Sequence, residues 1–129
     1  MSVIVTDTGF ALEDWVPNAD HPELDISSDT DVAGLANQLP SLAMIRIDFP
    51  SFADGRGFSL AQRLRRMGYE GRLRAKGHVL ADQYAMARRS GFDEVEIDDN
   101  LAARQDEDQW LARADWRAHD YQLKLRGAG

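Results

Sequence analysis

The sequence has 129 residues, of which 43% are hydrophobic and 29% charged, a balance typical of one globular domain with a single core. It contains no cysteine, which excludes disulfide bonds, thiolate catalysis and metal centres held by cysteine. The formal net charge of −7 disfavours duplex nucleic acid as a partner, because binding there depends on neutralising phosphates. No stretch approaches the roughly 18 apolar residues of a membrane span. The N-terminus has no basic leader, so we expect a cytoplasmic protein without a membrane contact.

At the N-terminus, two short apolar segments flank the turn-forming sequence Asp-Thr-Gly. They cover residues 2–5 and 10–16, which predicts a β-hairpin over residues 1–16. A polar loop containing two prolines is expected over residues 17–28.

From residue 29 onward, helical patterns alternate with short apolar runs. Ser59 is a good N-cap, Leu60, Leu64 and Met67 share one face of the helix that follows, and Gly68 fits a left-handed C-terminal position. The predicted helices cover residues 31–38, 59–67, 79–90 and part of 101–119. The predicted strands cover residues 42–48, 72–75 and 92–97. We expect residues 29–119 to form the α/β body and residues 120–129 to be a frayed tail.

One short segment recurs along the chain. Arg65-Arg66-Met67-Gly68-Tyr69 is echoed 23 residues later by Arg88-Arg89-Ser90-Gly91-Phe92. In each copy a glycine closes a helix and an aromatic residue starts the next strand. We therefore predict a single α/β domain with a small parallel sheet of repeated helix–strand units and an N-terminal hairpin. The units form either an open layered sheet or an arc resembling part of a (β/α) barrel.

The charges are distributed unevenly along the chain. Residues 1–55 hold ten acidic residues and one basic residue, and residues 90–129 hold ten acidic and five basic residues. Residues 56–89 hold nine basic residues and only two acidic ones. A segment this basic either binds an anionic ligand or acidic partner, or forms ion pairs with the acidic flanks of its own chain.

The loop that enters this basic segment is a candidate anion site. Gly55 and Gly57 allow backbone N–H groups to approach a ligand, and Arg56 can clamp an oxyanion. The alternative is structural: Asp54 and the glycines form a turn, Ser59 caps the helix, and Arg56 pairs with an acid. Both interpretations remain open from the sequence.

Two further loops are expected at the same edge of the sheet, where the parallel strands end. One contains Lys76 and His78, and His78 lies four residues before Asp82, so that the two can form a general-base pair or a local surface contact. The other is Asp98-Asp99-Asn100, in which no recognisable metal-ligand spacing occurs, so we expect no metal and no cofactor. The residues predicted to bind a ligand are Asp54, Gly55, Arg56, Gly57, Ser59, Arg74, Lys76 and Gln83; His78 and Asp82 are the candidates for catalysis.

The motifs F-P-x-F-x-D-G-R, G-x-L-R-A-x-G-x-V-L-x-D-Q and R-x-G-F-D occur in this order between residues 49 and 93. With them, residues 28–97 resemble a bacterial family of unknown function whose members are labelled as oxidoreductases of sulfite reduction, because their genes lie near those for assimilatory sulfite reductase. The resemblance implies a role in sulfite assimilation but no established catalytic residues.

We therefore expect an accessory or binding protein of assimilatory sulfite reduction, with a basic rim that binds an oxyanion, sulfite reductase or another sulfur-assimilation protein. The alternatives are an oxidoreductase that uses an external or loosely bound cofactor, and an oligomerisation scaffold.

Overall fold

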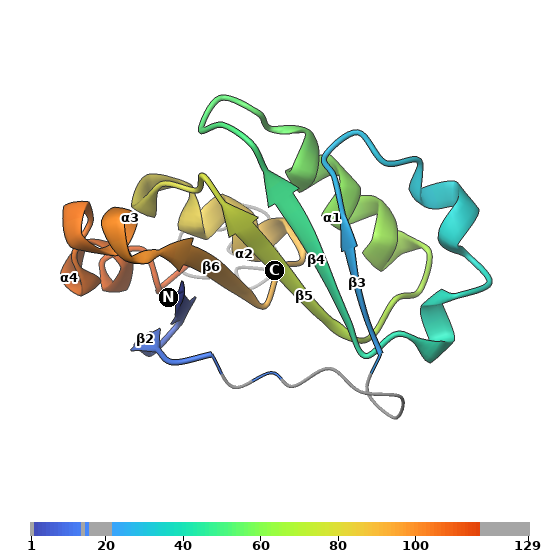
Figure 1. Ribbon diagram of the computed structural model, residues 1–129, viewed down its shortest axis with the longest axis horizontal. Helices are drawn as coiled ribbons and strands as arrows, with labels where there is room; N and C mark the ends of the chain where they lie inside the picture. The colour runs from blue at the N-terminus through green and yellow to red at the C-terminus, as the bar shows by residue number, and fades with distance from the viewer. Residues whose placement is uncertain (1, 14, 16–21, 117–129) are drawn as a thin grey trace, which may run out of the picture.

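The structure is a computed structural model, and it describes residues 2–13, 15 and 22–116. Within them, six strands form one open sheet in the order β2-β1-β6-β5-β4-β3 (Figure 1). The strands are β1 (Ser2–Thr6), β2 (Gly9–Ala11), β3 (Glu23–Ile26), β4 (Met44–Phe49), β5 (Arg72–Gly77) and β6 (Glu94–Asp98). β3, β4, β5 and β6 run parallel, whereas β1 is antiparallel to both β2 and β6. The predicted α/β class and N-terminal hairpin are confirmed, and the sheet is open.

Short helical segments connect the strands. The α-helices are α1 (Arg56–Arg66), α2 (Tyr84–Ser90), α3 (Asp99–Arg104) and α4 (Glu107–Leu111), and the 3-10 helices are η1 (Val32–Leu35), η2 (Leu39–Ser41) and η3 (Ala81–Gln83). Figure 1 shows α1 and α2 on the same face of the sheet, where they contact each other. α3 contacts β6 and β1, and α4 contacts β2. No helix in the described part of the chain is long and apolar enough to cross a membrane.

The two faces of the sheet differ in chemistry because successive side chains of a strand point to opposite faces. The helix-covered face is apolar, and its buried residues include Ile45, Ile47, Leu73, Ala75 and Val95. Burial of this set against α1 and α2 supplies the main stabilising term of the fold.

The opposite face is an ionic layer. Its centre is Arg74, which is fully buried and donates through Nη2 to Glu94 Oε2 and through Nη1 to Glu96 Oε1, both at 2.9 Å. Arg74 Nη1 also contacts the carboxylate of Glu13, which comes from the segment after β2. Arg46 completes the layer with ion pairs to three carboxylates, those of Glu23, Asp25 and Glu96. A buried guanidinium group requires such partners, and Arg74 of the basic segment is paired here with carboxylates from both acidic flanks.

The N-terminal third departs from the prediction in two places. The second strand ends at Ala11 instead of residue 16, because Leu12 is exposed and Glu13 turns toward Arg74. The predicted polar loop contains β3, in which Leu24 packs against the core and Ile26 is buried within it. In β3 polar and apolar residues alternate over only four positions, which is too short a pattern to predict a strand in a segment rich in prolines and acidic residues.

Helix boundaries account for the other differences. The helix expected over residues 31–38 is the single 3-10 turn η1. The helix expected over 79–90 is divided between η3 and α2, and the helix expected within 101–119 is divided between α3 and α4. The second division occurs at Gln105, whose extended backbone is followed by a new N-cap, Asp106. The predicted fraying of residues 120–129 lies outside the described residues.

Two predicted helix ends are confirmed. Gly68 follows α1 with φ +96°, and Gly91 follows α2 with φ +115°. Both angles lie in the left-handed region, which a glycine adopts without steric cost.

Candidate functional site

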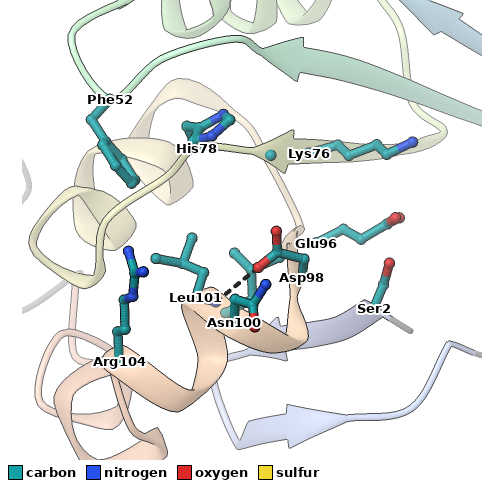
Figure 2. Close-up of a pocket in the computed structure, with 11 residues that line it drawn as sticks. Ser2, Phe52, Lys76, His78, Glu96, Asp98, Asn100, Leu101 and Arg104 are labelled. Carbon is teal, nitrogen blue, oxygen red and sulfur yellow. Dashed lines mark hydrogen bonds between the residues drawn. The ribbon is translucent and has the colours of Figure 1, made fainter.

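A cleft of about 430 Å³ opens where β5 and β6 end (Figure 2). Side chains that line it include Phe52, Lys76, His78, Asp98, Leu101 and Arg104. They come from the loop after β4, the end of β5, the end of β6 and helix α3. The carboxyl edge of a parallel sheet is where α/β proteins most often bind ligands, so the fold and the cleft indicate the same place.

His78 is oriented by its neighbours. Its Nδ1 lies 3.1 Å from the backbone oxygen of Phe49, and its ring meets the ring of Phe52 edge-on at 5.2 Å. Since a carbonyl oxygen only accepts hydrogen bonds, Nδ1 donates, and in the neutral imidazole Nε2 then carries the lone pair. Nε2 can therefore accept a proton or a hydrogen bond from a molecule in the cleft.

Two cationic side chains, those of Lys76 and Arg104, border the cleft. The side chains of Lys76 and Arg104 form no hydrogen bond or ion pair with any residue in the described part of the chain. Figure 2 shows them toward opposite ends, with the Arg104 guanidinium directed toward the Phe52 ring. An unpaired cation beside a concave surface is available to an anionic ligand.

The acidic groups of the cleft are already engaged. Glu96 Oε1 is paired with Arg46 at 3.1 Å and with Arg74 at 2.9 Å. Asp98 is the N-cap of α3 and accepts from the backbone N–H of Leu101 at 2.8 Å through Oδ1. Glu96 therefore shares its two arginines with other carboxylates, and Asp98 contacts a backbone N–H rather than a cation.

The loop predicted to bind an anion is neutralised by its own residues. Asp54 Oδ2 accepts hydrogen bonds from Arg56 Nη2 at 2.9 Å and from Ser28 Oγ at 2.8 Å. Asp54 Oδ1 also accepts from the backbone N–H and Nε of Arg56. The hydrogen bonds from Arg56 and Ser28 lower the pKa of Asp54 well below its usual range. This arrangement matches the part of the structural alternative in which Arg56 pairs with an acid.

Other predicted residues of this loop have packing roles. α1 begins at Arg56, with Gly55 at the N-cap position, so Ser59 lies inside the helix and is not its cap. A Cβ on Gly57 would lie 2.4 Å from the Phe49 ring, which shows that the absent side chain lets α1 approach the sheet. The predicted helix start was wrong because Asp54, upstream of the N-cap, already accepts the backbone N–H of Arg56, the first residue of the helix.

The remaining predicted residues are dispersed. Arg74 lies in the ionic layer and does not line the cleft. Gln83 accepts from Leu80 N–H at 2.8 Å and donates to the Phe52 carbonyl at 3.1 Å, so it shapes the cleft without lining it. Asp82 pairs with Arg113 at 2.8 Å, and the structure does not form the predicted pair with His78.

Sequence reasoning missed Phe52 and Arg104 as candidate site residues. Phe52 belongs to the F-P-x-F motif but has no charge to attract attention. Arg104 is the last residue of α3, which starts at the Asp98-Asp99-Asn100 loop already expected at this edge. α3 is six residues long and begins at the N-cap Asp98, and its last side chain, that of Arg104, lies beside the cleft. This position cannot be predicted unless the length of the helix is known.

The chain matches a known family model over most of its length. A family model described as "Bacterial protein of unknown function (DUF934)" matches residues 23–128. No curated protein and no solved structure matches the chain.

Proposed function

The chain belongs to this bacterial family of unknown function, and we propose that it is a small anion-binding protein whose site is the cleft between β5, β6 and α3. The observation that carries the proposal is the pair Lys76 and Arg104. Both residues line the cleft, and neither side chain forms an ion pair with a described residue.

Other basic side chains support this assignment by contrast. Arg46 and Arg74 are used in the ionic layer, and Arg56 is held by Asp54. Each of these groups would have to break an ion pair before it could bind a ligand. Lys76 and Arg104 bind an anion without that cost, through charge-assisted hydrogen bonds.

We place this activity in the cytoplasm, in assimilatory sulfite reduction. The support is the sequence resemblance of residues 28–97, together with a cleft whose chemistry suits a sulfur oxyanion or a molecule that carries one. The protein then acts as an accessory that holds such an anion for sulfite reductase or for another sulfur-assimilation protein.

Calorimetric titration with sulfite, sulfate and phosphate tests the anion site. The double variant Lys76→Gln/Arg104→Gln is compared with Arg63→Gln/Arg66→Gln, which removes the same charge from the exposed surface of α1. We expect the cleft variant to lose at least about tenfold in affinity, since hydrogen bonds to charged groups contribute about 1.5–3 kcal/mol. Binding of no anionic probe by the wild type, whether a simple oxyanion or a larger molecule that carries one, or equal losses in both double variants, would remove the proposal.

A pull-down at low salt tests the pathway separately. The tagged protein is exposed to a lysate of its host, and sulfite reductase in the eluate supports the accessory role. An eluate that contains neither sulfite reductase nor another sulfur-assimilation protein contradicts that role, whatever the calorimetry shows.

A further inference from the structure

We propose that the ligand of the cleft is a mononucleotide-like molecule, with a flat heterocyclic ring against Phe52 and a phosphate or other strong acid at Lys76. The proposal rests on the anion-binding function above and adds the chemical class of the ligand. It is carried by the size of the cleft and by the order of the side chains along it.

The cleft is too large for a simple oxyanion. Its volume of about 430 Å³ lies in the range of roughly 300–1,000 Å³ that holds drug-sized or cofactor-sized ligands. Sulfite or phosphate, with four or five heavy atoms, would fill only a small part of it.

One end of the cleft suits a flat ring. Phe52 is 41% exposed although it is a large aromatic residue, and its backbone is held in place by Gln83. Figure 2 shows the Arg104 guanidinium directed toward Phe52 and the half-buried Leu101 beside them. Aromatic rings and guanidinium planes both stack on heterocyclic bases, and such stacking does not depend on which base is bound.

The middle and the far end suit a hydroxylated linker and an acid. Asp98 uses Oδ1 for the N–H of Leu101, which leaves Oδ2 to accept a hydrogen bond from a ligand hydroxyl. Asn100 lies next to it with an exposed amide. Beyond them in Figure 2 lies Lys76, whose side chain extends to the same side as that of Glu96, a carboxylate paired with Arg46 and Arg74. A lysine ammonium is a compact charge of the kind that binds phosphate. The order of aromatic, hydroxyl-binding and cationic groups matches base, ribose and phosphate.

A series of probes tests the assignment: inorganic phosphate, ribose 5-phosphate, adenosine and AMP, each titrated calorimetrically. We expect AMP to bind about tenfold or more tightly than ribose 5-phosphate, and Phe52→Leu to abolish this difference without weakening ribose 5-phosphate. Lys76→Gln should weaken AMP but leave adenosine unchanged. A thermal melt of each variant confirms that it remains folded.

The outcomes separate the two proposals. If phosphate, ribose 5-phosphate and AMP bind equally well, or if adenosine binds as tightly as AMP, the mononucleotide assignment is overturned. If no anionic probe binds to the wild-type protein, the anion-binding function itself fails.

Discussion

Arg65 and Arg88 end two successive helices in the same way. Each guanidinium donates through Nη1 to the backbone carbonyl four residues later, Tyr69 O at 2.9 Å for Arg65 and Phe92 O at 2.6 Å for Arg88. The sequence repeat is therefore a structural repeat, in which an arginine near the end of a helix binds the turn that precedes the next strand. Arg65 and Arg88 both belong to the basic segment of residues 56–89, and both use their charge in contacts within the fold.

We predict that Arg65→Lys destabilises the protein by about 2–3 kcal/mol. Arg65 also donates to Gly91 O at 3.0 Å, Gly71 O at 2.9 Å and Asp93 Oδ2 at 3.0 Å, and a lysine cannot reproduce this planar set. Urea unfolding measures the change. The neighbouring exposed Arg66→Lys is the control, and it should shift stability by less than about 0.5 kcal/mol. Equal effects at the two positions would contradict the structural role of Arg65.

Gly57→Ala tests whether this glycine serves packing or a ligand. The new methyl group would lie 2.4 Å from Phe49, so we expect a loss of about 1–3 kcal/mol in thermal or chemical unfolding. Gly34→Ala is the control, because a Cβ there meets no atom within 4 Å. Adding Phe49→Leu to Gly57→Ala should recover part of the loss. A Gly57→Ala protein of unchanged stability would refute the packing role.

Asp7→Asn tests an ion cluster that joins the hairpin to α2. Although burial opposes the shift, hydrogen bonds from Tyr84 and Arg88 lower the pKa of Asp7 below its ordinary value of 3.8. A lowered pKa stabilises the folded state above pH 3.8, and this contribution is lost as the pH falls through the folded-state value. We expect Asp7→Asn to cost about 1–3 kcal/mol at pH 7 and the two proteins to converge in acid.

The measurement is the free energy of unfolding of each protein between pH 2 and 7. Asp108→Asn, on the exposed side of α4, should run parallel to the wild type. A difference between wild type and Asp7→Asn that stays constant with pH would argue against the charge of Asp7 as the cause.

Tyr69→Phe tests how the stability of the protein falls at alkaline pH. Burial raises the pKa of Tyr69 to about 12, against an ordinary value of 10.0, and its hydroxyl donates to Arg72 O at 3.1 Å. This contribution is complete below pH 10 and is lost as the pH rises toward 12, because only the unfolded chain ionises there. The variant should be about 1 kcal/mol less stable at pH 7 and should overtake the wild type near pH 12, since two pKa units correspond to about 3 kcal/mol. Unfolding curves at pH 7, 10 and 12 check the crossing, and parallel curves contradict it.

Much of the fold could be predicted from local pattern. The strand centred on Ile45, the apolar stripe of Leu60 and Leu64, and the glycines at positions 68 and 91 each carry a local signal of periodicity or backbone conformation. β3 could not be predicted, because a four-residue edge strand gains its identity from pairing with β4 rather than from its own sequence.

The candidate site was predictable only in part. The sheet edge and its residues Lys76 and His78 follow from the rule that ligands bind at the carboxyl ends of parallel strands. The role of Arg56 could not be decided, because a sequence does not tell whether an arginine turns toward a ligand or toward an aspartate two residues away. The position of Arg104 beside the cleft could not be predicted, because it depends on the length of α3, and helix ends are poorly defined by local propensity.

The most direct test of the account is a backbone-amide NMR titration of the wild-type protein with AMP and with inorganic sulfate. The central claim is that anions bind at the cleft and not at the loop of Asp54 and Arg56. We predict the largest chemical-shift changes at the amides of Gly77, His78 and Leu101, with the amides of residues 55–57 unchanged. Changes that centre on residues 55–57, or their absence at the cleft with both anions, would contradict it.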